Sequence, residues 1–258
     1  MSRSEGPFRY PAGFFAGLLA TTGFFTRLPV SPGSADTWRL ADSAWAFPLV
    51  GAGIGGIAAF AFLFAQLIGL ATWPAALLSI LAALILTGAL HEDGLADTAD
   101  GFFGGSNREE KLTILRDSRH GTYGVLAIVF SVLLRTAALA GIGDVIHAGL
   151  ALIAAHAASR AVLPAAMWKL APARPDGLGA TAGTPRAGGA LAAALIGAAI
   201  ALAALGPLRG AIALCLTGVI VFAMAALARR QIGGHTGDVL GAFQQIGEIL
   251  ILLAASAR

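Results

Sequence analysis

The feature that most constrains the fold is a series of long apolar segments along the chain. Seven of them are suited to crossing a bilayer as helices, which takes about 20 apolar residues each. Only 12% of the residues are charged and the mean hydropathy is +0.79, which is too apolar for the polar surface of a soluble domain. We therefore predict an all-α, polytopic membrane helix bundle forming a single domain over residues 1–258, with about seven transmembrane helices at residues 46–71, 74–91, 121–142, 145–167, 189–206, 210–228 and 239–255.

An eighth apolar segment, residues 13–26, is shorter than a full span. It follows Arg3 and Arg9 as in a signal peptide, but no small-residue cleavage site comes after it. We expect it to be retained as a short N-terminal hydrophobic helix, either interfacial or re-entrant. Within the next segment, Gly51, Gly55 and Gly56 have the small-residue spacing that favours close helix packing.

Lysine and arginine alternate between the two sides of the predicted bundle. Four connecting segments on one side hold eleven of them, and the other side holds only Arg209 and Arg258. Because cytoplasmic loops are enriched in positive residues, this pattern predicts that the first side is cytoplasmic. The four segments are residues 27–45, 92–120, 168–188 and 229–238.

An acidic sequence, HEDGLADTADG at residues 91–101, begins at the end of a predicted span on that side. Asp93, Asp97 and Asp100 are spaced to fall on one face of a helix, where their charges repel unless a cation lies between them. Carboxylate oxygens suit Mg²⁺, with Mn²⁺ as an alternative, so these three residues are candidate metal ligands. A plain solvated acidic turn is the other interpretation. His91 and Glu92 point away from this face and are expected to have supporting or structural roles.

Basic residues follow the acidic sequence and lie near Asp117. We expect Arg116 and Arg119 to bind phosphate groups, because guanidinium groups pair well with phosphate oxygens. The positive charge bias of cytoplasmic loops explains Arg108 and Lys111 without a further role.

A third polar cluster near the C-terminus recurs at helical spacing, at Asp238, Gly241, Gln245 and Glu248. Ionisable residues inside apolar segments are functional candidates by default, and Glu248, Arg160 and Arg135 are of this kind. Arg160 is close enough to the cytoplasmic end to reach the site. Arg135 lies deeper, which favours a structural salt bridge.

Five separated motifs together resemble the cobalamin synthase family, the adenosylcobinamide-GDP ribazoletransferases. The motifs are HEDGLADTADG, RDSRHGTYG at 116–124, GGHTGDVLGAFQQIGE at 233–248, FFTRLPV at 24–30 and FPLVG at 47–51. The resemblance implies a Mg²⁺-dependent enzyme of the bacterial cytoplasmic membrane, with its active site on the cytoplasmic face. Such an enzyme joins adenosylcobinamide-GDP to α-ribazole or its 5′-phosphate and releases GMP, in the last steps of vitamin B12 assembly.

The resemblance also implies roles for individual residues. Asp93, Asp97 and Asp100 would hold the metal, and either Asp117 or Asp238 would accept the attacking hydroxyl proton or complete the metal shell. Of the candidate substrate-binding residues, Arg116, Arg119, Gly121 and Thr236 match these motifs, whereas Arg160 and Glu248 are candidates from their positions inside apolar segments. The chain departs from the family pattern at Glu92 and His120, where apolar residues are usual, and at Gln245, where an acid is common.

Two other functions fit parts of the pattern. A lipid-headgroup transferase of the CDP-alcohol type also uses aspartates on membrane helices, but the Ala-Arg that should follow Asp-Gly is missing. An ion or metal transporter would place its charges at the bilayer midplane and show internal repeats. We expect the lipid bilayer as a partner and no nucleic acid. Small-residue helix faces also allow a homo-oligomer, and tethering of other B12 assembly enzymes would explain the membrane location.

Overall fold

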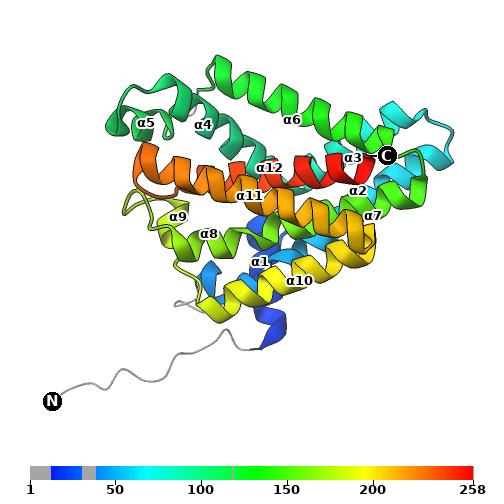
Figure 1. Ribbon diagram of the computed structural model, residues 1–258, viewed down its shortest axis with the longest axis horizontal. Coiled ribbons are helices and arrows are strands. Elements are labelled where there is room, and N and C mark those ends of the chain that lie inside the picture. Colours follow the sequence, from blue (N-terminus) through cyan, green and yellow to red (C-terminus); the bar gives the residue numbers. More distant parts are fainter. Residues whose placement is uncertain (1–12, 31–38, 118, 258) are drawn as a thin grey trace.

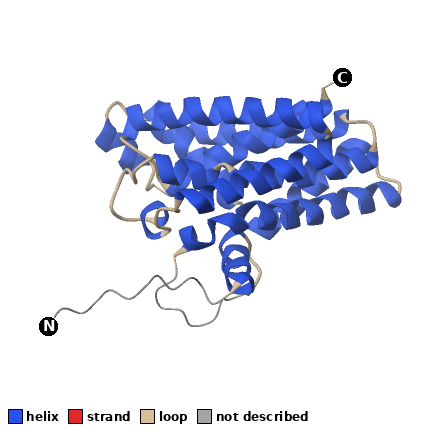
Figure 2. Ribbon diagram, turned by 60° about the horizontal axis from the view of Figure 1, so that its bottom comes forward, coloured by secondary structure: helices blue, strands red, loops and turns tan. Residues whose placement is uncertain are grey.

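The structure, a computed structural model, describes residues 13–30, 39–117 and 119–257 as a bundle of helices (Figures 1 and 2). Every secondary-structure element of more than one residue in these ranges is a helix. The helices are α1 (Phe14–Phe25), the 3₁₀ helix η1 (Leu40–Ala46), α2 (Phe47–Leu67), α3 (Thr72–Thr87), α4 (Leu90–Gly104), α5 (Arg108–Ile114), α6 (Thr122–Gly141), α7 (Val145–Ala161), α8 (Leu163–Lys169), α9 (Leu178–Thr181), α10 (Ala187–Leu205), α11 (Pro207–Ile232) and α12 (Gly237–Ser256).

The number of membrane-crossing helices agrees with the prediction. In the described ranges, six continuous helical segments are long and apolar enough to cross a bilayer, and the bent pair α3 and α4 makes a seventh if it is counted as one span. Helix α1 has 12 residues, about 18 Å, which is too short for an apolar core about 30 Å thick. Figure 1 shows α1 lying across the long direction of the bundle, as expected for a short N-terminal helix that does not span.

The predicted span at residues 74–91 is wrong at its C-terminal end. Helix α3 stops at Thr87, and Gly88 and Ala89 both adopt left-handed backbone conformations, with φ of 64° and 57°. The chain then starts α4 at an angle of 91° to α3. A left-handed conformation suits Gly88 but is costly for Ala89, so the surrounding packing must hold this bend in place. The acidic sequence therefore lies on a separate helix rather than at the end of a span.

Two helices, α7 and α12, form the centre of the bundle. Helix α7 packs against α2, α10 and α12, while α12 also packs against α4, α6 and α11. The buried face of α7 is rich in alanine, which lets neighbouring backbones approach closely where lipid provides no hydrophobic driving force. These buried alanines are Ala148, Ala151, Ala154, Ala155, Ala157, Ala158 and Ala161.

The contact between α2 and α7 depends on two of the three glycines identified in the sequence. Gly51 faces the backbone of His156 and Ala157. A Cβ on Gly55 would lie 2.6 Å from the carbonyl oxygen of Leu152 and 2.7 Å from the Cα of Ile153. Gly56 has no such role, because a Cβ there would meet no atom within 4 Å in the described part of the chain.

The bundle carries its polar segments at one end. In Figure 1, α5, α9 and the turn between α11 and α12 lie at the left, whereas the C-terminus lies at the right. The loops with the most lysine and arginine therefore share one end with the acidic helix α4, as the sequence predicted.

The tight α2–α7 contact gives a stability prediction. Gly55→Ala should destabilise the protein by about 1–3 kcal/mol, because the added methyl group overpacks a backbone contact that cannot relax easily. Gly56→Ala, one residue away on the same helix, is the matched control and should not lower stability, because the added methyl group has space and alanine has the higher helix propensity. Thermal unfolding of both variants in the same detergent would test this, and equal melting temperatures would contradict the packing role of Gly55.

Candidate functional site

Three side chains from α4 and from the loop before α6 converge at the polar end of the bundle. Asp93 and Asp97 lie one helical turn apart on α4, and His120 lies beside both. Its Nε2 is 3.7 Å from Asp93 Oδ1, and its Nδ1 is 3.6 Å from Asp97 Oδ1. One ligand atom from each of the three residues lies within 4.8 Å of the others. This geometry can hold one cation.

A third carboxylate, that of Asp238, comes to the site from the start of α12. Gly94 makes the approach possible, since a Cβ at Gly94 would lie 2.8 Å from the carbonyl oxygen of Asp238. Thr236 caps α12 by accepting from the Val239 amide, and its hydroxyl donates to Asp238 Oδ2 at 3.1 Å. The charges of Asp93 and Asp238 both act on Asp97. The site therefore gathers negative charge that a cation would neutralise.

Asp100, the third acid predicted to lie on this helix face, makes a different set of contacts. Its carboxylate accepts the backbone N–H groups of Gly121 and Gly124, at 2.7 and 2.9 Å. Gly121 is the N-cap of α6, so Asp100 satisfies amides that the first turn of a helix leaves unpaired. A Cβ at Gly124 would collide with the same carboxylate. Asp100 thus fixes the start of α6, and with it the neighbouring His120, against α4. The metal-ligand role of Asp100 stays a prediction.

The two arginines expected to bind phosphate are exposed, and each pairs with an acid outside the cluster. Arg116 donates to both oxygens of Asp176, at 2.8 and 2.7 Å. Arg119 pairs with Asp117 at 2.7 Å, and its hydrogen bonds lower the pKa of Asp117 to about 2. Such exposed pairs are weak and exchange readily. Both guanidinium groups are therefore available to an incoming anion, and their binding role stays a prediction.

Below the acidic site lies a buried network centred on Arg135. Arg135 NH1 donates to Glu92 Oε1 at 3.0 Å and to Glu248 Oε1 at 2.9 Å, and all three side chains are buried. His156 and Gln244 contact the second oxygen of Glu248, at 3.1 and 2.6 Å. The expected structural salt bridge of Arg135 is confirmed, and Glu92 has the structural role predicted for it.

Two departures from the family pattern meet in this network. Gln245 donates to Glu92 Oε1 at 2.9 Å and accepts from the Ser131 hydroxyl at 2.8 Å. Between them, the acid at position 92 and the amide at position 245 supply one negative charge beside Arg135, in addition to that of Glu248. A pattern with an apolar residue at 92 and an acid at 245 would supply the same charge.

The structure separates two further predicted substrate-binding residues from the acidic cluster. Glu248 is bound within the Arg135 network, and Arg160 is buried with NH1 3.1 Å from His156 Nδ1. The Arg160 guanidinium also lies over the Phe25 ring, 5.7 Å from its centroid. Binding of substrate by these two residues stays a prediction.

Two basic residues attributed to charge bias alone have structural roles. Arg108 donates to the carbonyl oxygens of Ile232 and Ala173, and Lys111 donates to those of Phe102 and Gly105. The Lys111 bonds satisfy carbonyl groups at the C-terminal end of α4, where a cation also complements the helix dipole.

Sequence reasoning missed the contribution of His120 and that of Arg174. The only signal for His120 was its departure from the apolar residue usual at that position. Arg174 was counted only as a loop charge, but its NH2 lies 3.7 Å from Asp238 Oδ2. No spacing rule links Arg174 to Asp238, because the two residues belong to separate segments of the chain.

Comparisons with known proteins agree with the motifs of this site. The family model for cobalamin-5-phosphate synthase matches residues 17–256. A Bradyrhizobium diazoefficiens protein named adenosylcobinamide-GDP ribazoletransferase is 48% identical over 243 residues, covering 94% of each chain. Proteins of the same name from Mesorhizobium japonicum and Brucella ovis are 49% and 41% identical, covering 90% and 93% of this chain and 90% and 96% of their own. No solved structure matches the chain.

The Arg135 network predicts strong destabilisation when its centre is removed. Arg135→Met should cost about 3–5 kcal/mol, because it leaves two buried carboxylates without their cation. Arg230→Met, at an exposed position on α11, is the matched control and should have little effect. Unfolding in detergent, followed by circular dichroism, would measure both, and an Arg135→Met protein as stable as wild type would contradict the structural role.

The contacts of Asp100 predict that its removal destabilises the protein, whereas removal of Asp93 does not. Asp100→Ala should lower stability by about 0.5–2 kcal/mol, the usual cost of losing a helix cap. Asp93→Ala, at an exposed side chain, should leave stability unchanged or raise it in the absence of divalent cations, since it removes a repulsive charge. Melting temperatures in EDTA would separate the two, and an equal loss in both variants would argue against the capping role.

Proposed function

The chain belongs to the cobalamin-5-phosphate synthase family, and we propose that it joins adenosylcobinamide-GDP to α-ribazole or its 5′-phosphate, with release of GMP. It is a membrane transferase of late cobalamin biosynthesis. The observation that carries the specific reaction is the near full-length match to relatives of that name. Family membership decides against the lipid-headgroup transferase and the transporter.

The acidic cluster supports a divalent cation as the cofactor. Asp93 and Asp97 offer carboxylate oxygens, the donors that Mg²⁺ and Mn²⁺ prefer, and His120 offers a nitrogen that transition metals accept more readily than Mg²⁺ does. We propose that these residues hold Mg²⁺ or Mn²⁺. Asp100 stays a candidate ligand, because a carboxylate that accepts two amides keeps lone pairs free. A bound cation would neutralise charge on the diphosphate and on the leaving oxygen.

The remaining polar residues would position the reacting groups. In the proposed reaction, the ribazole hydroxyl oxygen bonds to the phosphorus attached to cobinamide, and the bond from that phosphorus to the GMP oxygen breaks. Arg174 contacts Asp238, and Arg119 directly precedes His120 in the chain; together with Arg116 they would bind phosphate oxygens. Gly121 and Thr236 would act by holding the elements that carry His120 and Asp238 in place.

Asp238 is the better of the two candidates for accepting the hydroxyl proton. It lies beside the other acids at the start of α12. Asp117 instead pairs with the exposed Arg119, and no hydrogen bond or ion pair joins it to the acids of α4 in the described part of the chain.

We further propose that the site faces the cytoplasm of a bacterial cell, at the inner membrane. The supporting observation is that the loops richest in lysine and arginine lie at the same end as the acids. Association with a second copy, or with other enzymes of the pathway, stays a prediction.

The direct test is GMP release by the purified protein in detergent. Wild type given adenosylcobinamide-GDP, α-ribazole and Mg²⁺ should release GMP, and omission of ribazole or addition of EDTA should stop it. Asp97→Asn should reduce the rate by about 100-fold or more, because it removes a charged group that stabilises the metal–phosphate complex. Glu109→Gln, at an exposed acid of α5, is the matched control and should keep wild-type activity.

A binding measurement separates the metal site from the reaction. Electron paramagnetic resonance of Mn²⁺ should show binding to wild type and Glu109→Gln, and weaker binding to Asp97→Asn. A folded wild type that releases no GMP would overturn the proposed reaction. Full activity in EDTA would overturn the metal requirement alone.

A further inference from the structure

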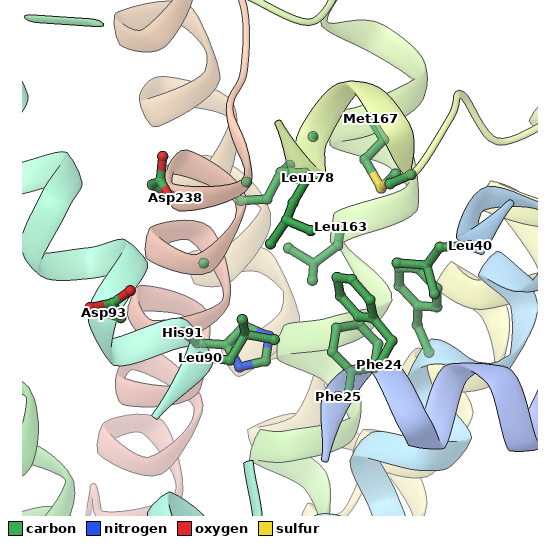
Figure 3. Close-up of a pocket in the computed structure, with 16 residues that line it drawn as sticks. Phe24, Phe25, Leu40, Leu90, His91, Asp93, Leu163, Met167, Leu178 and Asp238 are labelled. Atoms are coloured by element: carbon green, nitrogen blue, oxygen red, sulfur yellow. The ribbon is translucent and has the colours of Figure 1, made fainter. Parts of the chain in front are cut away.

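A cavity opens next to the acidic site and extends away from it between α1, η1, α8 and α9. Asp93 and Asp238 line its polar edge. The rest of its described lining is apolar except for His91, and its main side chains are Phe24, Phe25, Phe47, Leu163, Met167 and Leu178. Figure 3 shows Phe24, Phe25, Leu163 and Met167 on one side of the cavity, with the two aspartates at the opposite edge.

The aromatic wall of the cavity is held firmly. Phe25 is 2% exposed, and its ring packs edge-to-face on Phe47 with centroids 4.9 Å apart. His91 lies on another side of the same ring, 5.5 Å between centroids, and the Arg160 guanidinium lies over it. Phe25 therefore has little freedom to move, and a preformed wall of this kind binds a flat ligand without the cost of ordering side chains.

His91 supplies a second observation that points to a ligand. It lines the cavity and is 3% exposed, and neither nitrogen of its imidazole hydrogen-bonds to another residue in the described part of the chain; Nδ1 is sealed by packing, which leaves Nε2 as the nitrogen with accessible area. A buried polar atom without a partner costs about 1–3 kcal/mol, so such atoms are usually satisfied by something. A ligand with one polar atom among apolar ones would satisfy Nε2.

Under the proposed function, three parts of the substrates are candidates for binding in this cavity. The guanine of GMP carries several donors and acceptors, which an apolar wall would leave unpaired. The corrinoid is too large for a cavity of about 660 Å³ that already includes the open mouth. The base of α-ribazole is a flat, dimethylated benzimidazole with one free ring nitrogen, which matches an aromatic cavity with one unpaired imidazole.

We infer that this cavity binds the aromatic base of the ribazole acceptor, with His91 as a positioning residue for the ring nitrogen. The inference rests on the proposed function and names the acceptor subsite of that same site. Since the cavity meets the acids at Asp93 and Asp238, a base bound there would place its ribose, with the attacking hydroxyl, toward the metal site.

The test uses Leu178, which lines the cavity but is 57% exposed, so that substitutions there should not disturb folding. Leu178→Trp should raise the KM for α-ribazole by about 10-fold or more, the usual effect of filling or emptying an apolar pocket. The KM for adenosylcobinamide-GDP should change less than about 2-fold, well below that range. Leu208→Trp, at a 73% exposed leucine at the start of α11, is the matched control and should change neither constant.

Two further variants keep the inference falsifiable if the tryptophan distorts α9. Leu178→Ala should weaken the binding of α-ribazole. It should also raise the activity with a riboside whose base has one more fused ring, relative to the activity with α-ribazole. His91→Phe should reduce discrimination between α-ribazole and an analogue with CH in place of the free ring nitrogen. A purely structural role for His91 would lower activity with both acceptors equally.

The outcomes separate this inference from the proposed function. A wild type without GMP release overturns the function itself. An active wild type in which Leu178 variants change the KM for adenosylcobinamide-GDP, change both constants alike or change neither overturns the acceptor site and leaves the function standing. A selective change in the KM for α-ribazole supports both.

Discussion

A buried arginine shared by two glutamates joins the helices that carry the site. Arg135 on α6 reaches Glu92 on α4 and Glu248 on α12, and each of these charges would be costly in an apolar bundle without the others. These hydrogen bonds fix how the three helices are rotated about their axes and how far each is shifted along its axis relative to the others. Because Glu92 directly precedes Asp93, holding Glu92 inward also determines where the acidic face of α4 points.

The bend at Gly88 and Ala89 works together with this network. A straight continuation of α3 would have carried the acids along the bundle axis. The 91° turn instead packs α4 against α12 and α6, with Gly94 on Asp238 and Asp100 on the first turn of α6. One short helix thereby presents Glu92 to the buried network and Asp93 and Asp97 to the open end. The strained Ala89 backbone is the local cost of that geometry, and the packing of α4 offsets it.

The arrangement also explains how a membrane protein can handle large polar substrates. The acids, the arginines and His120 lie at the end of the bundle with the long polar connections. The apolar cavity next to them is lined by the short helices α1 and α9, and by η1 and α8, which belong to the candidate spans Leu40–Leu67 and Val145–Lys169. Charged parts of the substrates can then bind at the acids and arginines while apolar parts bind in the adjacent cavity, so that no charge is buried without a partner.

Hydrophobicity and helical period are local properties of a sequence, and they were sufficient to predict much of the fold. Apolar segments of bilayer length fixed the class and the approximate number of spans. The spacing of Asp93 and Asp97 placed them on one face of a helix, and a buried position for Arg135 implied a partner. What the sequence could not provide was the identity of partners far apart in the chain. Glu92 and Glu248 are 43 and 113 residues from Arg135, and no period links such positions.

The tertiary structure alone decided where α3 ends, that Asp100 binds backbone amides, and that His120 and Asp238 complete the acidic cluster. Each of these depends on a glycine: Gly88 takes a left-handed conformation, Gly121 brings its amide to the Asp100 carboxylate, and Gly94 lets the backbone of Asp238 approach. A glycine in a sequence permits a close approach without saying what will make it. The sequence therefore determined the elements and the kind of chemistry, and packing determined which charged groups meet.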